Sequence, residues 1–300
     1  MDRVLTYCVE SECTVWDFLK RMGFPRGIIR RLKLQEDTVL VNGVGVFLNY
    51  CCVPGDSLVI RILEDVGTGH IVPVDLPIRI LYEDEDIVLL DKAADMPIHP
   101  SQGNFDNTLA NGLTFYYEQK GESFVYRCIT RLDRDTTGVL LVAKNGLSAA
   151  LLSQQMLRRE IHRTYLAVVE GIPAESTGRI EAPISRVDGS TIEREVNFDA
   201  GERAVTNYQV IRSITYEGRD YSLVKLQLET GRTHQIRVHM KYLGYPLIGD
   251  FLYNPNYSIM KRQALHSSSL SFVHPISGKM LDFTAPIPAD MKWIYECDIL

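Results

Sequence analysis

The spacing of hydrophobic and polar positions near the start of the chain predicts two short helices. Apolar side chains recur every three or four residues from Val15 to Met22, which is the period of an amphipathic helix. Thr14 and Asp17 resemble a capping box at its beginning. A second helix is expected around residues 28–33, with its apolar side chains inward and its basic side chains on the other side.

The pattern then changes to β structure. Asn42-Gly43 separates two apolar runs, 39–41 and 44–48, and this dipeptide favours the tight turn of a β-hairpin. A last strand is expected at residues 57–63, after a Pro-Gly-Asp turn. Together with the helices, these elements predict a small, compact α+β domain at residues 1–66.

A second and larger domain is predicted after a linker. Glycines and prolines at residues 67–77 are typical of a linker, and the larger domain would occupy 78–300. Within it, short strand-like segments such as 87–90 and 221–228 outnumber helices, and a helix of about fifteen residues is expected after Asn145. We predict an α+β fold with a mixed, largely antiparallel sheet, because a doubly wound parallel sheet would need more helices.

Composition limits the class of protein. The chain has 300 residues, of which 45% are hydrophobic, and this is enough for one large domain or for a large and a small one. No apolar run is long enough to span a bilayer, and no signal peptide is recognisable. Six cysteines are scattered without a C-x-x-C pair, which argues against a zinc site and against a secreted disulfide framework. We expect a soluble, reduced, cytoplasmic protein.

The formal net charge of −6 conceals two basic segments. Residues 20–35 hold six basic side chains and no acidic one, while residues 127–163 hold seven basic side chains against three acidic ones. Separate basic patches on an acidic body suit a polyanion that is bound at defined places. The candidate RNA-binding side chains of the first segment are Lys20, Arg26, Arg30, Arg31 and Lys33.

Two helices with a basic outer face, followed by a hairpin, resemble the RNA-binding module of ribosomal protein S4. The likeness is carried by F-L-K-R-M-G-F-P-R-G-I-I-R-R-L-K, V-L-V-N-G and V-P-G-D-S-L-V-I-R-I. The alternative is a small solvated helical hairpin without a ligand. Neither interpretation of the N-terminal domain reveals which reaction the protein catalyses.

A charged loop at residues 131–138 is the first candidate for chemistry. It ends at Gly138, directly before an apolar strand, and this places it at the rim of a sheet. Neighbouring arginines keep an Asp ionised even where water is partly excluded, and an ionised Asp can act as a base or a nucleophile. Asp133 is the candidate carboxylate, and Thr136 belongs to the same loop. On charge pattern alone, a surface loop laced with salt bridges is equally consistent.

A second candidate stretch, T-G-R-T-H-Q-I-R-V-H-M at 230–240, reads as a strand end followed by a helix. Helical spacing puts His234, Arg237 and Lys241 on one basic face, and cations at a strand-to-helix junction form a ready anion site. The spacing of His234 and His239 directs them to different faces, which argues against a metal. Candidate contacts from this stretch are Arg232, His234 and Arg237.

Two further residues have both a structural and a functional interpretation. Tyr165 lies in the apolar strand 165–169, where core packing is the ordinary explanation, yet a Tyr at the end of a pocket can stack on a base or take a proton. His99 lies in a loop that two prolines make rigid, and we interpret it as structural.

Taken together, these motifs resemble the RluA-type pseudouridine synthases. The motifs that match, in this order, are M-P-I-H-P-S, R-L-D-R-D-T-T-G-V-L-L-V-A-K-N, R-T-Y-L-A-V-V-E-G, T-G-R-T-H-Q-I-R-V-H-M, G-D-F-L-Y and A-L-H-S-S-S-L-S-F-V-H-P. The resemblance runs from about Ile80 to Met291. One motif alone would be weak evidence for the family, whereas the ordered set of motifs is highly specific.

The resemblance assigns roles to individual residues. Asp133 matches the catalytic aspartate, and Arg131 matches the arginine that enters the RNA stack and helps to expel the target uridine. Tyr165 matches the tyrosine that packs on the uracil and removes the C5 proton, and Arg237 matches the arginine paired with the catalytic carboxylate. Two positions depart from the family. The usual His before Arg131 is Thr130, which leaves the bracing of the loop open, and a Thr at 137 replaces the common Ser but keeps the hydroxyl.

The resemblance implies an isomerase that needs no cofactor and no metal, because uracil is detached, rotated and rejoined through C5 without oxidation. The implied partner is RNA, with large-subunit ribosomal RNA favoured by the N-terminal module and transfer RNA as the alternative, and we expect a monomer. Two other functions stay open at this point. One is a noncatalytic RNA-binding or ribosome-assembly factor, which Thr130 favours, and the other is a hydrolytic nucleoside glycosylase.

Overall fold

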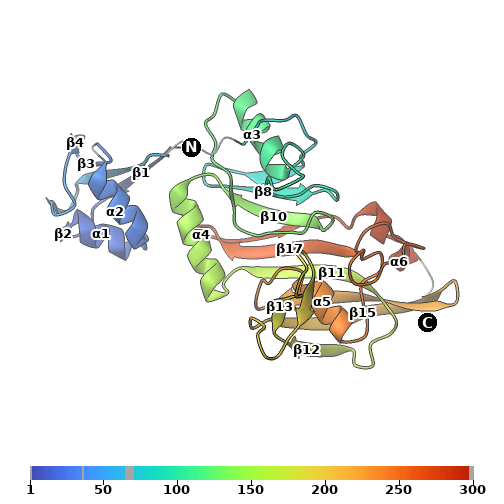
Figure 1. The fold of residues 1–300 in the computed structure, drawn as a ribbon. Helices are drawn as coiled ribbons and strands as arrows, with labels where there is room; N and C mark the ends of the chain where they lie inside the picture. The colour runs from blue at the N-terminus through green and yellow to red at the C-terminus, as the bar shows by residue number, and fades with distance from the viewer. Residues whose placement is uncertain (1, 36, 65–70, 297–300) are drawn as a thin grey trace.

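The computed structural model describes residues 2–35, 37–64 and 71–296 of the chain. The first unit contains β1 (Arg3–Cys8), β2 (Cys13–Thr14), α1 (Val15–Arg21), α2 (Arg26–Leu34), β3 (Val39–Val41), β4 (Val44–Gly45), β5 (Cys51–Cys52) and β6 (Ser57–Ile62). Strands β1, β6, β3 and β4 form one antiparallel sheet in that order, and β2 pairs with β5. Helices α1 and α2 pack against this sheet (Figure 1).

Both predicted local signals of this unit are present. The Thr14 hydroxyl accepts a hydrogen bond from the backbone N–H of Asp17 and so caps α1. Asn42 and Gly43 both have positive φ, 50° and 82°, at the turn between β3 and β4, where Val41 pairs with Val44. Positive φ at two central residues is the requirement of a type I′ hairpin turn, which explains the Asn-Gly pair.

The described residues from 71 to 296 form the second unit. Its elements are β7 (Ile80–Glu83), β8 (Ile87–Lys92), α3 (Leu109–Gln119), β9 (Arg127–Cys128), β10 (Thr137–Ala143), α4 (Gly146–Arg158), β11 (His162–Glu170), β12 (Thr177–Glu181), β13 (Ile184–Arg186), β14 (Arg194–Val196), β15 (Val205–Tyr216), β16 (Arg219–Leu228), α5 (Gln235–Tyr242), β17 (Leu265–Val273), β18 (Met280–Thr284), a 3₁₀ turn (Ala289–Met291) and α6 (Trp293–Glu296). None of the helices in the described part of the chain is both long and apolar enough to cross a membrane.

A ten-stranded sheet organises this unit in the order β12-β15-β16-β11-β17-β10-β8-β7, with β18 beside β17 and β9 beside β10. Among the strand pairs described for this sheet, β10 with β17 is parallel and the others are antiparallel. The predicted α+β class with a largely antiparallel sheet is therefore confirmed.

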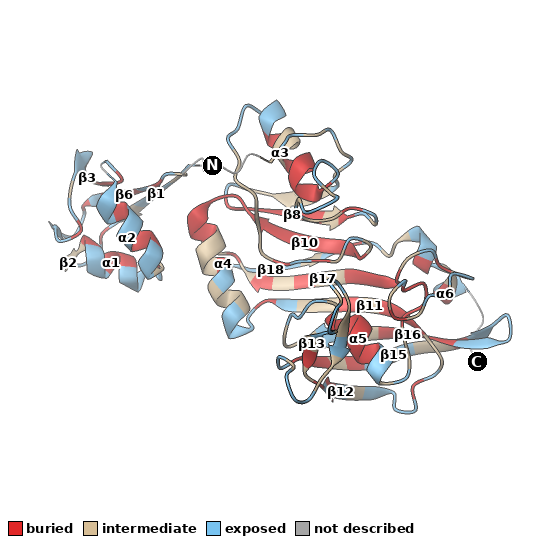
Figure 2. Cartoon of the chain, in the orientation of Figure 1, coloured by how far each residue is buried: buried red, intermediate tan, exposed pale blue. Residues whose placement is uncertain are grey.

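The centre of this sheet is buried on both faces (Figure 2). Successive side chains of a strand point to opposite faces, and in β8 Val88 and Leu90 pack toward α3 while Ile87 and Leu89 pack toward α4. Helix α5 covers β11 and β16 on the α3 side, and its Ile236 belongs to the same apolar cluster. Two-sided burial makes the middle strands a rigid base for the loops at their ends.

Helix α4 connects the two units. Its Leu147 belongs to the apolar core of the N-terminal unit, whereas Met156 lines a pocket on the second unit. These two residues lie about 14 Å apart along the helix axis at 1.5 Å per residue. Glu64 accepts a hydrogen bond of 2.6 Å from the backbone N–H of Gly146 at the start of α4 and forms an ion pair with Arg127. The N-terminal unit is thus attached to the second unit by both apolar and charged contacts.

Part of the segment predicted as a linker packs against the second unit. The Asn111 side chain of α3 donates to the Val72 carbonyl oxygen at 2.7 Å, the N–H of Val74 donates to the Asn111 carbonyl, and Leu76 packs on the apolar core. The glycine-rich start of that segment, 67–69, lies outside the described residues. The described part, 71–77, is therefore ordered along α3.

Candidate active site

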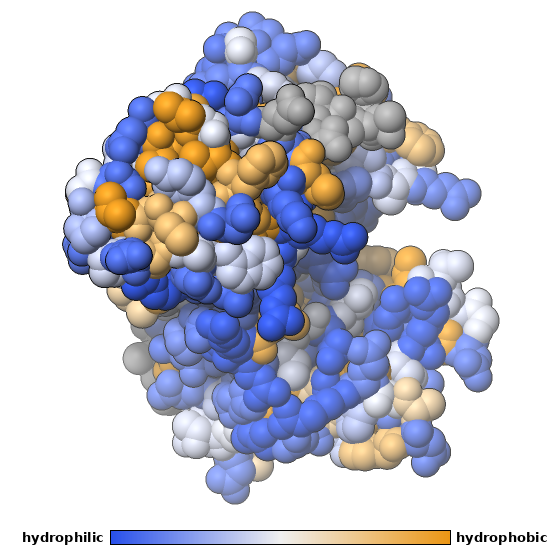
Figure 3. All heavy atoms as spheres, turned by 90° about the vertical axis from the view of Figure 1, so that its left-hand side faces the viewer, coloured by the Kyte–Doolittle hydropathy of each residue, from blue (hydrophilic) through white to orange (hydrophobic). Residues whose placement is uncertain are grey.

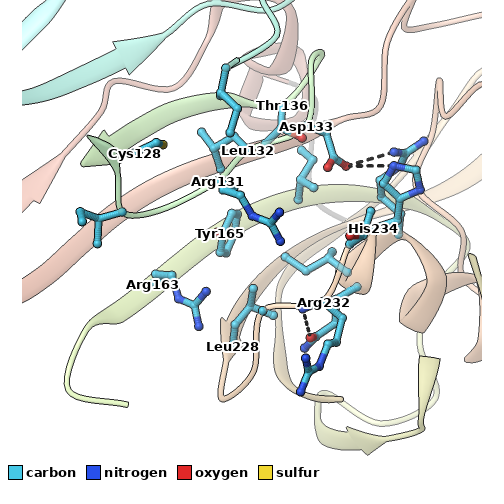
Figure 4. Close-up of a pocket in the computed structure, with 18 of the residues that line it drawn as sticks. Cys128, Arg131, Leu132, Asp133, Thr136, Arg163, Tyr165, Leu228, Arg232 and His234 are labelled. Carbon is cyan, nitrogen blue, oxygen red and sulfur yellow. Dashed lines mark hydrogen bonds and ion pairs between the residues drawn. The ribbon is translucent and has the colours of Figure 1, made fainter. Parts of the chain in front are cut away.

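A cavity of about 510 Å³ opens at the ends of β10, β11 and β16, beside α5. Its wall comes from several separate segments of the chain, and Figure 4 shows their side chains converging on one space. The lining includes Ile98, Cys128, Arg131, Leu132, Asp133, Thr136, Met156, Arg163, Tyr165, Leu228, Arg232, His234, Ile236, Arg237 and Leu265. The pocket thus contains all seven candidates that the sequence placed in the second domain.

Backbone contacts hold the loop that carries Asp133. The N–H of Thr136 donates to the Asp133 carbonyl oxygen at 3.1 Å, which closes a turn. Gly138, with φ of 107°, follows at the start of β10, and a Cβ there would lie 2.1 Å from the Ser267 carbonyl oxygen. Only glycine therefore permits β10 to approach β17 this closely. The close approach fixes where the loop emerges from the sheet.

Lys92 supports the same loop from the interior. Its buried Nζ donates to the carbonyl oxygens of Ala93, Met96 and Arg134 at 2.7, 2.9 and 2.7 Å. Burial lowers the pKa of Lys92 to about 7, against the attraction of Asp135 and Asp133. This lysine was not among the sequence candidates, because a Lys at the end of a strand ordinarily points to solvent.

Arg237 connects Asp133 to a second carboxylate. Its Nη1 donates to Oδ2 of Asp133 at 3.0 Å, while Nε and Nη2 donate to the two oxygens of Asp250 at 2.7 Å each. Arg237 is 1% exposed and Asp250 is fully buried. Burial works against the charged guanidinium, but the hydrogen bonds and charges of Asp250 and Asp133 outweigh it and raise the pKa of Arg237. Arg237 therefore stays charged and holds Asp133 in place.

The basic face predicted at residues 234–241 is only partly exposed. The helical period correctly grouped His234, Arg237 and Lys241, but only Lys241 is exposed. Arg237 points inward because Asp250, from the segment after the helix, supplies the partner that a buried guanidinium needs. Asp250 was missed as a site residue, although it is the acid of the G-D-F-L-Y motif.

His234 lies at the N-cap of α5 and faces Asp133. Its Nε2 is 4.0 Å from Oδ2 of Asp133, and its backbone has a positive φ of 57°. Burial lowers the pKa of His234, so the ring is neutral at neutral pH. Arg232, by contrast, is exposed at the rim, where it forms an ion pair with Glu202.

Tyr165 forms part of the pocket wall from β11 and is 5% exposed. Burial raises the pKa of its hydroxyl, and the charge of Asp133 acts in the same direction, while Arg163 opposes both. Arg163 also lines the pocket, donates to the Thr230 carbonyl oxygen at 3.4 Å, and has no partner for its buried Nε among the described residues. It is a third residue that was not among the sequence candidates, although it precedes Tyr165 in the R-T-Y motif.

The remaining candidates divide between the rim and the N-terminal unit. Arg131 is exposed and its side chain points into the pocket, whereas Thr136 is buried in the wall. His99 is exposed and does not line the cavity, although the neighbouring Ile98 does.

In the N-terminal unit the guanidinium of Arg31 lies beside Gly146 of α4. The other basic candidates there are exposed and are Lys20, Arg26, Arg30 and Lys33.

One group of potential metal ligands lies away from the pocket. Asp84, Asp86 and His274 place ligand atoms within 4.8 Å of one another. Their hydrogen bonds are made within the protein, because His274 Nε2 contacts Asp84 at 3.0 Å and Asp86 accepts two hydrogen bonds from Arg3 of β1. The group is best explained as a junction between the two units.

Comparison with known proteins identifies the family. The family model for RNA pseudouridylate synthase matches residues 86–242. The chain is 39% identical over 279 residues to the uncharacterized RNA pseudouridine synthase YjbO of Bacillus subtilis, covering 93% of this chain and 97% of that protein. It is also 39% identical over 277 residues to ribosomal large subunit pseudouridine synthase D of Vibrio cholerae, covering 87% and 84%.

Solved structures agree with this match. The structure titled Human RNA Pseudouridylate Synthase Domain Containing 1 is 26% identical, with a TM-score of 0.59, and the similarity covers 74% of this chain and 86% of that one. The chain belongs to the RNA pseudouridine synthases of the RluA type, and it is an isomerase that acts on RNA.

Proposed function

We propose that this enzyme converts uridine to pseudouridine in large-subunit ribosomal RNA, with Asp133 as the reacting carboxylate. The observation that supports the proposal is the contact between Asp133 and Arg237 at the pocket wall. A buried guanidinium that is already fixed by Asp250 presents one remaining N–H to Asp133. It can stabilise the ionised carboxylate without moving during the reaction.

The pocket suits a nucleotide that has left its helix. Extruding a base costs roughly a few kcal/mol, which contacts with the vacated stack and the phosphates can offset. Arg131 is exposed at the rim and serves in this proposal as the wedge that replaces the extruded uridine. The guanidinium of Arg163 lines the pocket and is suited to an RNA phosphate or to a uracil oxygen.

Tyr165 packs on the uracil in this proposal and takes part in removing the C5 proton. Because burial raises the pKa of Tyr165, its hydroxyl carries a proton at neutral pH. It can accept the C5 proton only after it has released its own proton to solvent, and the positive charge of Arg163 beside it favours that release. The pair Tyr165 and Arg163 would therefore act together.

The N-terminal unit is proposed as an S4-type RNA-binding domain. Its exposed basic side chains on α1 and α2 suit phosphate contacts, and α4 connects this unit to the pocket. Proteins similar to this chain are named ribosomal large subunit pseudouridine synthase D, in Vibrio cholerae and in Zymomonas mobilis. These names favour ribosomal RNA over transfer RNA as the substrate.

Replacement of Asp133 tests the proposed chemistry. Asp133→Asn keeps the shape of the side chain and removes its charge, and we expect it to abolish pseudouridine formation in ribosomal RNA while RNA binding survives. Asp135→Asn is the matched control, because Asp135 lies in the same loop but contacts Arg134 and the backbone N–H of Asp95. Substantial turnover by Asp133→Asn would contradict the assignment.

A second experiment tests the substrate. Pseudouridine is mapped in ribosomal and transfer RNA from cells with the gene, without it, and with the Asp133→Asn form. We expect at least one position in large-subunit ribosomal RNA to be modified only in the presence of the active enzyme. Modification confined to transfer RNA would keep the chemistry and overturn the substrate.

A further inference from the structure

The two oxygens of the Asp133 carboxylate have different surroundings. Oδ2 accepts the hydrogen bond from Arg237 at 3.0 Å and is also the oxygen that His234 Nε2 faces at 4.0 Å. Among the described residues, no hydrogen bond reaches Oδ1. The protein therefore holds one oxygen and leaves the other to the pocket.

The hydrogen bonds around Tyr253 favour one tautomer of His234. The Tyr253 hydroxyl oxygen accepts from the backbone N–H of Arg194 at 2.9 Å, and it lies 2.9 Å from Nδ1 of His234. A phenol has a single proton, and Nδ1 is the acceptor within reach of it. When the hydroxyl donates to Nδ1, the proton of the neutral ring is on Nε2, the nitrogen that faces Asp133.

The backbone of His234 is consistent with a functional constraint. A residue other than glycine at φ of 57° is strained by about 1 kcal/mol or more, and such strain persists where the surroundings demand it. At this position the left-handed conformation begins α5 and lets the ring reach both Tyr253 and the pocket. The charged groups that face the ring are Asp133, Arg237, Asp250 and Arg194.

We propose that Tyr253 is a positioning residue that holds His234 as the Nε2–H tautomer, and that this N–H is a second, uncharged donor at Oδ2 of Asp133. The donor approaches Oδ2 when RNA fills the pocket, so that Oδ1 is the oxygen directed at the uridine. The proposal rests on the proposed role of Asp133 as the reacting carboxylate.

One short segment aligns both donors. Asp250 binds Arg237, and three residues later Tyr253 binds His234. The segment is closed on itself, because the N–H of Tyr253 donates to Oδ1 of Asp250 at 3.2 Å, and the Tyr253 ring lies 5.0 Å from the Arg237 guanidinium. Removal of the Tyr253 hydroxyl alone, which keeps the ring beside Arg237, should therefore reach Asp133 through His234.

The tautomer can be measured directly by ¹⁵N NMR of the histidine rings in the full chain at neutral pH. His234 is assigned by the signal that His234→Gln removes. We expect an unprotonated Nδ1 and a protonated Nε2 in the wild type, and a mixture of tautomers in Tyr253→Phe. A protonated Nδ1 in the wild type would overturn the proposal. This readout needs no activity, so it is independent of the test at Asp133.

A double-mutant cycle on turnover tests the consequence. We expect Tyr253→Phe to lower kcat about tenfold with little change in KM, and to have almost no further effect in a His234→Gln background. Tyr245→Phe is the matched control, since the Tyr245 hydroxyl also accepts a backbone N–H, from Ala174 at 3.2 Å, away from the pocket. Losses that add in the double variant would show that Tyr253 acts only on structure and would refute the inference.

Discussion

The pocket and the N-terminal unit use charged side chains in opposite ways. At the pocket, Arg237 is 1% exposed and makes three hydrogen bonds to two carboxylates. On α1 and α2, basic side chains such as Arg26 and Arg30 are exposed, and the face of the molecule that carries this unit shows hydrophilic side chains beside a group of apolar ones (Figure 3). Buried charges are fixed in geometry, whereas exposed charges are free to follow a flexible polyanion.

This difference determines which property of the protein a substitution in each region changes. A buried charge without its partner costs several kcal/mol because it cannot be solvated, so its loss affects stability and chemistry together. An exposed charge contributes through the release of counterions from RNA, so its loss affects affinity and is sensitive to salt. The comparison predicts separate phenotypes for the two regions.

The largest effect is expected from Arg237→Met. The substitution leaves Asp250 fully buried without its partner, and we expect the free energy of unfolding to fall by about 3–5 kcal/mol, with loss of activity. Denaturant unfolding measures this. Arg232→Met is the control, because its partner Glu202 is exposed and the expected loss is about 0–1 kcal/mol. Equal losses in the two variants would remove the distinction between buried and exposed charge.

The buried charge of Lys92 predicts a pH dependence of the free energy of unfolding. Its folded pKa of about 7 is below the ordinary value of 10.5, so between these pH values the unfolded chain binds more protons than the folded one. Stability contributed by this group therefore rises with pH across that window, by up to about 1.4 kcal/mol per pH unit. We expect the wild type to gain more stability than Lys92→Met between pH 7 and 10. Parallel curves would contradict it, and the exposed Lys241→Met is the control.

The sequence predicted local elements better than the partners of buried charges. The Asn42-Gly43 turn and the helix after Asn145 follow from signals within a few residues, and both were found. The candidates lining the pocket were found because their motifs carry recognisable side chains. Asp250 and Lys92 were missed because their importance depends on contacts with distant segments, which helical or strand spacing does not contain.

The N-terminal unit is expected to affect RNA affinity alone. Replacing Lys20, Arg26, Arg30 and Lys33 by Gln should weaken binding and lower the slope of log affinity against log salt by about 0.7–0.9 for each phosphate that is no longer neutralised. Turnover at saturating RNA should stay unchanged. Arg61→Gln is the control in the same unit, because Arg61 alternates with Ile60 and Ile62, which face the helices, and so lies on the opposite face of the sheet.

Salt titration of binding, followed by anisotropy of labelled RNA, measures both the slope and the affinity. An unchanged slope in the fourfold variant would show that these side chains do not bind phosphates. A fall in turnover at saturation would show instead that the unit helps to place RNA in the pocket. The second outcome would weaken the contrast between the two regions.

The smallest effect is expected from Thr130→Val, a change without charge in the buried region. Thr130 stands where the family usually has His, and its hydroxyl accepts the backbone N–H of Leu141 at 2.9 Å, which ties the Asp133 loop to β10. Valine keeps the shape and leaves that N–H unpaired, so we expect a loss of about 1–3 kcal/mol in unfolding and little change in RNA affinity. Thr215→Val, at an exposed hydroxyl, is the control. If Thr130→Val were as stable as the wild type, the other contacts of the loop, including those of Lys92, would be sufficient to hold it, and the hydroxyl would be replaceable.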